Sequence, residues 1–173
     1  MKLLELLKNV TTFVFDVDGV LTDGSLLILQ GGVMARKMNV KDGYALQLAV
    51  KRGYRVVIIS GGNSAEVEDR LNKLGVSEVF MKVTDKIKVL SEYVETHSLN
   101  WSDLLFMGDD IPDAEVMKKV GVACCPADAV QEIKEISAYI SPLNGGFGSG
   151  RDVIEKVMKL RGSWNEDTHV PST

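Results

Sequence analysis

Short apolar runs alternate with amphipathic stretches along most of the chain. The runs are rich in β-branched and aromatic residues, as is typical of buried strands. They cover residues 11–16, 54–60, 78–81, 103–108, 122–125 and 138–141. The stretches have helical spacing, mostly with Asp or Ser at the start and often Gly at the end. They cover residues 42–53, 64–75, 85–98, 113–121 and 128–135. This alternation predicts an α/β fold, with a doubly wound, Rossmann-like parallel sheet between two layers of helices.

One segment breaks the alternation. Residues 25–39 contain two extended apolar runs on either side of Gly31 and Gly32, so we expect a β-hairpin that projects from the sheet. We expect residues 1–161 to form a single domain that carries this hairpin, and residues 162–173 to be a loose C-terminal tail.

Composition narrows the possible functions. The chain has 173 residues, of which 45% are hydrophobic, enough to bury one core. A net charge of -4 without a long basic run argues against a nucleic-acid partner. We find no apolar stretch long enough to span a membrane and no cleavable leader, so we expect a cytoplasmic protein without a membrane partner. Cys124 and Cys125 are neighbours, which favours neither a disulfide framework nor a cysteine zinc site.

Polar side chains collect where the predicted strands end. Carboxylates follow two strands and a hydroxyl follows a third: Asp16, Asp18, Asp109, Asp110, Asp113 and Ser60. Because the carboxyl ends of parallel strands meet at one edge of the sheet, we expect these groups to surround a single crevice. Carboxylates placed so close together repel one another, and a hard cation with oxygen ligands removes that repulsion. Mg²⁺ fits this set of groups, since it binds carboxylates, water and substrate phosphate together.

Four motifs resemble, in order and spacing, those of the haloacid dehalogenase superfamily of phosphohydrolases. They are DVDGVLTDG (16–24), Ser60 at a strand end, Lys86 at a helix start and GDDIPD (108–113). With the hairpin and the late GGFGSGRDVIEKV (145–157), the chain is most similar to small capless members that act on eight- and nine-carbon 2-keto-3-deoxy sugar acid phosphates. The resemblance implies an Mg²⁺-dependent phosphomonoester hydrolase acting on 3-deoxy-D-manno-octulosonate 8-phosphate (KDO 8-phosphate), in lipopolysaccharide biosynthesis.

The resemblance also implies roles for individual residues. Asp16 is the expected nucleophile, which forms an aspartyl-phosphate, and Asp18 is the expected proton donor and then acceptor. The Asp16 side chain, the Asp18 main-chain carbonyl and Asp109 are the expected metal ligands. Asp110 and Asp113 are expected to orient these ligands, although both residues could instead cap a helix.

The phosphate and the sugar acid need further contacts. We expect Ser60, the Gly61 amide and Lys86 to bind the phosphate, with Lys88 as the alternative lysine. Substrate-binding candidates are Arg70, which could equally pair with Glu66, and Arg151, which could instead be an ordinary residue at a helix N-terminus. At position 62 a glycine leaves the pocket wide, and by resemblance this favours the eight-carbon substrate.

Other functions remain open at this point. The nine-carbon 2-keto-3-deoxynononate 9-phosphate is an alternative substrate, and a phosphomutase of the same superfamily is an alternative enzyme. A receiver domain also has acidic residues and a lysine beside a parallel sheet, and it would be a signalling module rather than an enzyme.

The hairpin also leads to a prediction of how copies of the chain assemble. Neither usual insertion point has room for a cap domain, yet a sugar acid needs walls around it. The apolar hairpin 25–39 has too much exposed apolar surface to stand alone. We therefore expect a homotetramer, as in the resembled family, in which neighbouring subunits complete the site.

Overall fold

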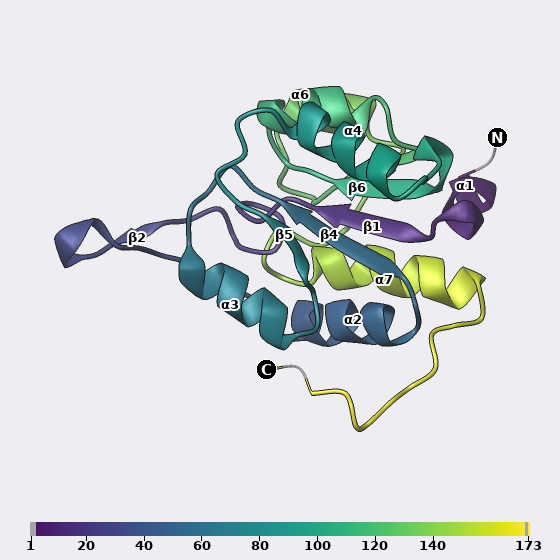
Figure 1. The fold of residues 1–173 in the computed structure, drawn as a ribbon, viewed down its shortest axis with the longest axis horizontal. Helices are drawn as coiled ribbons and strands as arrows, with labels where there is room; N and C mark the ends of the chain where they lie inside the picture. The colour runs from purple at the N-terminus through teal and green to yellow at the C-terminus, as the bar shows by residue number, and fades with distance from the viewer. Residues whose placement is uncertain (1–2, 172) are drawn as a thin grey trace.

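A parallel sheet of six strands runs through the centre of the molecule (Figure 1). The computed structural model describes residues 3–171 and 173. The strand order is β5-β4-β1-β6-β7-β8. The strands are β1 Thr12–Phe15, β4 Arg55–Ile59, β5 Glu78–Phe80, β6 Leu104–Met107, β7 Val122–Cys125 and β8 Tyr139–Ile140. Each strand lies within one of the apolar runs, so the strand predictions are confirmed.

Helices cover both faces of this sheet. One face carries α1 Leu3–Asn9, α2 Val40–Lys51, α3 Ala65–Lys73 and α7 Ser149–Leu160. The other face carries α4 Lys86–Thr96, α5 Ala114–Met117 and α6 Gln131–Ile136, with 3₁₀ turns η2 Trp101–Asp103 and η3 Ile111–Asp113 nearby in the chain. Side chains alternate along β1, so Phe13 and Phe15 pack on the first layer and Val14 packs on the second. The doubly wound α/β fold is confirmed.

Between β1 and α2 the chain leaves the sheet as a hairpin. Its strands, β2 Leu27–Ile28 and β3 Met34–Ala35, pair antiparallel around the turn η1 Gln30–Gly32. Gly31 and Gly32 have φ values of 82° and 80°, which glycine adopts without steric cost. The hairpin projects away from the sheet (Figure 1), as predicted, and within the described residues no cap domain accompanies it.

Helix α1 was not predicted, and helix α7 was considered only as an alternative setting for Arg151. The start of α7 is hidden by the glycine-rich loop before it, because glycine is a poor helix former. Its buried residues Val153, Ile154 and Val157 nevertheless have helical spacing. Helix α1 has only 7 residues, too few for a clear period. Helix α7 packs against both α1 and α2.

The segment after α7 is packed rather than loose. Lys51 of α2 forms an ion pair with Asp167 at 2.6 Å, and the Tyr44 hydroxyl donates to the Asp167 carbonyl oxygen. Val170 is buried against the core. The side chains of α2 therefore hold the C-terminal segment on the domain.

Candidate active site

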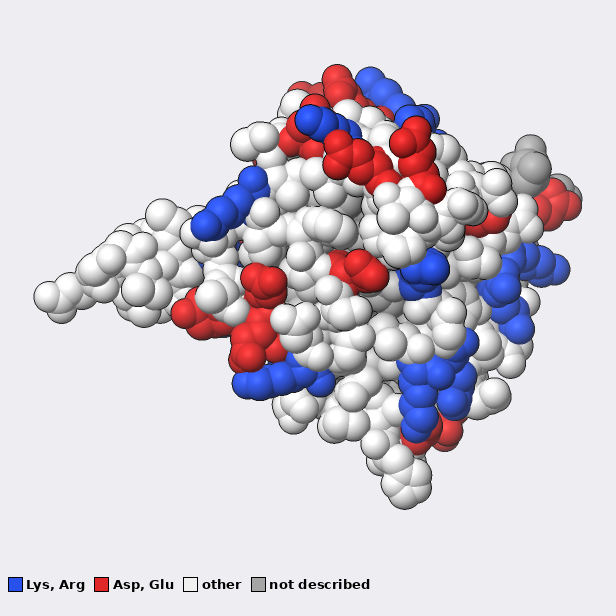
Figure 2. All heavy atoms as spheres, in the orientation of Figure 1, with Lys and Arg blue, Asp and Glu red and all other residues white. Residues whose placement is uncertain are grey.

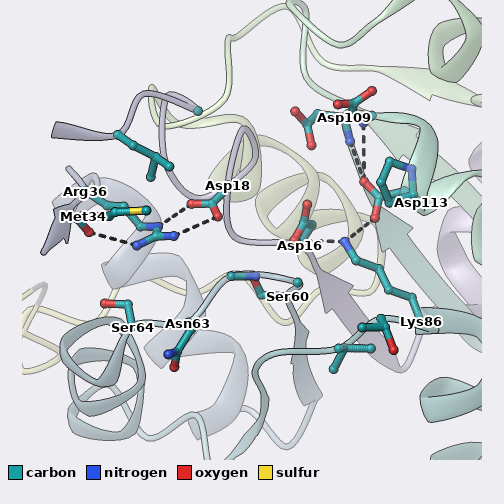
Figure 3. Close-up of a pocket in the computed structure, with 18 of the residues that line it drawn as sticks. Asp16, Asp18, Met34, Arg36, Ser60, Asn63, Ser64, Lys86, Asp109 and Asp113 are labelled. Carbon is teal, nitrogen blue, oxygen red and sulfur yellow. Dashed lines mark hydrogen bonds and ion pairs between the residues drawn. The ribbon is translucent and has the colours of Figure 1, made fainter. Parts of the chain in front are cut away.

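The carboxyl ends of β1, β4 and β6 meet at a crevice of about 1060 Å³. The strand order reverses at β1, with β4 on one side and β6 on the other, and such a switch point opens a crevice at the edge of a parallel sheet. The predicted residues that line it are Asp16, Asp18, Ser60, Gly61, Lys86, Asp109, Asp110 and Asp113. The fold thus brings residues from three strand ends and the start of α4 to one place (Figure 3).

Lys86 pairs with two carboxylates inside the crevice. Its Nζ lies 3.1 Å from Asp16 Oδ1 and 2.6 Å from Asp113 Oδ1. Asp85 is the N-cap of α4, and its side chain accepts from the Lys88 amide. The helix therefore begins at Lys86, whose side chain is buried in the crevice, whereas Lys88 is exposed. Lys86 is therefore the lysine of the crevice.

Two carboxylates of the crevice have strongly raised pKa values. Burial, reinforced by the charge of Asp113, raises the pKa of Asp16 to about 7. Burial also raises the pKa of Asp109 to about 8, and the charges of Asp16 and Asp113 add to the effect. Burial opposes the charge on Lys86, but the two carboxylates beside it raise its pKa. Oxygens of Asp16, Asp109 and Asp113 lie within 4.8 Å of one another, a set that suits a divalent cation.

The Asp113 carboxylate bridges Lys86 and the loop after β6. Its Oδ1 accepts from Lys86, and its Oδ2 accepts from the Asp109 amide at 3.0 Å. This leaves Asp109 freer than Asp113 to bind a cation. Asp110 lines the crevice but also caps η3, because its Oδ1 accepts from the Ile111 amide at 2.7 Å.

A braced loop carries Ser60 and Gly61. The Ser60 amide donates to the Phe80 carbonyl, and the Ser60 carbonyl accepts from the Val83 amide. These bonds tie the end of β4 to the chain leaving β5. The loop leads to Ser64, the N-cap of α3. Backbone amides before a helix N-terminus suit the binding of phosphate oxygens.

Arg36 was not among the predicted site residues, yet it contacts Asp18. Its Nε donates to Asp18 Oδ1 at 2.6 Å, and its Nη2 donates to Asp18 Oδ2 at 3.3 Å (Figure 3). The side chain of Arg36 is only 5% exposed. Buried charges are rare unless they are paired. The only signal in the sequence was the basic pair Arg36 and Lys37 at the end of an apolar segment, and it does not indicate which of the two turns inward.

The two predicted substrate-binding arginines lie outside the residues that line this crevice. Arg70 lines a neighbouring groove between the hairpin and α3. Arg151 lies at the start of α7, with its guanidinium 5.5 Å from the ring centres of Tyr44 and Trp164 and its Nε 3.3 Å from Glu155. The packing of α7 on α2 therefore holds Arg151 away from this crevice.

The glycines of GGFGSG (145–150) pack against the segment that follows β1. A Cβ atom on Gly145 would lie 1.8 Å from the Gly19 carbonyl oxygen, so only glycine fits here. The Gly146 amide donates to the Val20 carbonyl oxygen, and its own carbonyl accepts from the Asn39 side chain. These glycines form a close packing contact rather than a flexible connector.

Comparison with known proteins agrees with this geometry. Residues 75–146 match the family model described as haloacid dehalogenase-like hydrolase. The chain is 31% identical to the 3-deoxy-D-manno-octulosonate 8-phosphate phosphatase KdsC of Escherichia coli K12, over 92% of this chain and 85% of that protein. This chain belongs to the haloacid dehalogenase-like hydrolases. Its relatives in this family are phosphatases, so it is a phosphatase and not a receiver domain.

Solved structures of this hydrolase family have the same fold. The 3-deoxy-D-manno-octulosonate 8-phosphate phosphatase of Yersinia pestis superposes with a TM-score of 0.90 at 28% identity, covering 92% of this chain and 86% of that one. The corresponding enzyme of Moraxella catarrhalis, solved in complex with a magnesium ion, a phosphate ion and a KDO molecule, also has a TM-score of 0.90 at 28% identity. That alignment covers 93% of this chain and 92% of the other.

None of the helices within residues 3–171 has the length and apolarity needed to cross a bilayer.

Proposed function

We propose that this phosphatase hydrolyses KDO 8-phosphate, with Mg²⁺ as its metal, to KDO and inorganic phosphate. The observation that carries the proposal is the meeting of Asp16, Lys86 and Asp109 at the carboxyl edge of the sheet. The proposal is supported by the names of relatives that match over 92% of the chain.

The geometry suits a two-step transfer through Asp16. Its Oδ1 accepts from the Val17 amide at 2.7 Å and pairs with Lys86, which leaves Oδ2 as the attacking atom. A bond forms between this oxygen and phosphorus while the bond from phosphorus to the sugar oxygen breaks. Asp18 gives a proton to the departing oxygen and later accepts one from the water that hydrolyses the aspartyl-phosphate.

The residues present fit a divalent metal ion. Asp16 and Asp109 would hold it with the Asp18 main-chain carbonyl. Burial raises the pKa values of both carboxyl groups and the neighbouring carboxylates add to the effect, so a bound cation would stabilise their charged forms. When bound, the ion would supply positive charge that reduces the repulsion between the phosphate and the attacking carboxylate. Ser60, the Gly61 amide and Lys86 would bind the remaining phosphate oxygens.

The substrate test compares two sugar acid phosphates. The eight-carbon 8-phosphate and the nine-carbon 9-phosphate are assayed side by side with Mg²⁺, and we expect the higher kcat/KM for the first. Asp16→Asn keeps the side-chain volume but removes the nucleophile, so turnover should fall more than about a thousandfold. Asp69→Asn, an exposed aspartate of α3, is the matched control and should retain activity. Preference for the nine-carbon substrate, or an active Asp16→Asn enzyme, would contradict the proposal.

We also propose that the hairpin assembles the chain into a tetramer. Its apolar side chains are largely solvent-exposed in the single chain, and the projecting tip of the hairpin is white, without Lys, Arg, Asp or Glu, on the face shown in Figure 2. Leu27 and Ile28 are 64% and 63% exposed. Replacing both with Asp should give smaller species in sedimentation velocity, whereas Leu4→Asp, an exposed leucine of α1, should not. A fully active wild-type monomer would contradict the proposal.

A further inference from the structure

Arg36 is a buried cation that the mechanism above does not use. It follows β3 on the returning strand of the hairpin, and its side chain turns back into the crevice (Figure 3). The guanidinium donates to both carboxylate oxygens of Asp18, and its Nη1 donates to the Met34 carbonyl oxygen at 3.0 Å. All three nitrogens of the guanidinium are thereby engaged.

Such an arrangement fixes the orientation of the carboxyl group. A buried guanidinium is costly unless its hydrogen bonds are satisfied, so Arg36 requires a partner at this point. Its planar fork sets both the position and the plane of the carboxylate that it binds. The Asp18 side chain is 32% exposed and would otherwise be free to adopt other rotamers. Arg36 therefore selects one orientation of Asp18.

The pair is packed beside the predicted phosphate-binding residues. A Cβ atom on Gly62 would lie 2.8 Å from Asp18 Oδ2, 3.0 Å from Arg36 Nη2 and 3.3 Å from Ser60 Oγ. The two charged groups thus pack directly against the backbone of Gly62, where a larger side chain would displace them. This contact places the paired carboxyl group at the edge of the phosphate site, where a departing oxygen would lie.

We propose that Arg36 is a positioning residue that holds the Asp18 carboxyl group in place for proton transfer to the leaving oxygen. The inference rests on the proposed function. Nε keeps hold of Oδ1 through the shorter hydrogen bond, while Oδ2 passes its proton to the sugar oxygen as the bond from that oxygen to phosphorus breaks. The hairpin thereby contributes a residue to the site of its own subunit.

The experiment varies the leaving group. Three substrates are compared: KDO 8-phosphate, an aldose phosphate that lacks the carboxylate, and p-nitrophenyl phosphate. The two sugars leave as poorly stabilised alkoxides and need a proton, whereas p-nitrophenolate leaves without one. The measured quantity is kcat/KM, which reports the first phosphoryl transfer.

Arg36→Gln should lower kcat/KM for both sugar phosphates by about 10- to 100-fold, the range that a misplaced proton donor costs. For p-nitrophenyl phosphate we expect a loss of less than about threefold, which also shows that the variant is folded. Arg36→Lys should recover part of the loss, because it keeps the cation but not the fork. Lys37→Gln is the matched control, since the neighbouring side chain is 83% exposed and faces Asp23, and all three substrates should be unaffected.

Two results would overturn the inference. An equal loss with all three substrates would make Arg36 a purely structural residue. A loss confined to KDO 8-phosphate would make it a ligand of the substrate carboxylate. If the wild-type enzyme hydrolyses the other two substrates but not KDO 8-phosphate, the proposed substrate is wrong, and the comparison of the remaining pair still decides the role of Arg36.

Discussion

Asp42 is a buried carboxylate whose ionisation should lower the stability of the protein near neutral pH. It lies in the first turn of α2 and is only 2% exposed. Its Oδ1 accepts from the Arg151 amide at 2.8 Å, but Oδ2 has no hydrogen-bond partner among the described residues. Burial raises its pKa from 3.8 to about 6, although the Arg151 and Gly148 amides favour the charged form.

The sign of the effect follows from proton counting. Between pH 4 and 6 the folded protein keeps a proton on Asp42 that the unfolded chain has lost, so stability falls as the pH rises. The full penalty is reached above the folded pKa and amounts to about 3 kcal/mol, for a pKa difference of about two. Asp42→Asn cannot ionise, and its amide oxygen can still accept from the Arg151 backbone. Relative to the wild type, this variant should gain about 2 kcal/mol in unfolding free energy between pH 4.5 and pH 7.5.

Urea unfolding followed by circular dichroism at pH 4.5, 6.0 and 7.5 measures this gain. Comparing Asp42→Ala with Asp42→Asn separates the contribution of the hydrogen bond to stability from the contribution of the charge. It should be less stable than Asp42→Asn by a roughly constant amount at every pH, because the lost acceptor does not titrate. A difference between wild type and Asp42→Asn that stays constant across the three pH values would refute the reasoning.

Three further predictions concern the crevice and its support. Excess EDTA should stop turnover, and Asp109→Ala should raise the Mg²⁺ concentration for half-maximal activity at least about tenfold, because a direct ligand is lost; activity that survives EDTA would contradict the metal site. Gly145→Ala should destabilise the protein by about 1–3 kcal/mol in thermal unfolding and lower kcat, because its Cβ would collide with the Gly19 carbonyl; an unchanged kcat would show that the contact is not needed. Lys86→Met should cost about 3 kcal/mol of stability by removing the buried cation that pairs with Asp16 and Asp113, and adding Asp113→Asn should restore part of it in urea unfolding; strictly additive effects would argue against the pairing.

The strands and the acidic crevice could be predicted from local patterns. Buried strands of a parallel sheet are continuous apolar runs, and their carboxyl ends meet at one edge whatever the details of packing. The sequence therefore predicts that Asp16, Ser60 and Asp109 lie around one crevice, and in the fold they do. The projecting hairpin could also be predicted, because two extended apolar runs around a pair of glycines interrupt the alternation of strands and helices.

The contacts between distant segments could not be predicted in this way. Arg36 lies 18 residues from Asp18, and only the register and twist of the hairpin decide that Arg36, and not Lys37, turns into the crevice. Likewise, the docking of α7 on α2 places Arg151 beside the rings of Tyr44 in α2 and Trp164 in the C-terminal segment. Local sequence determines which residues stand at strand ends. The direction in which a side chain leaves a hairpin or a helix, and the group it meets there, depends on packing between elements, which only the tertiary structure decides.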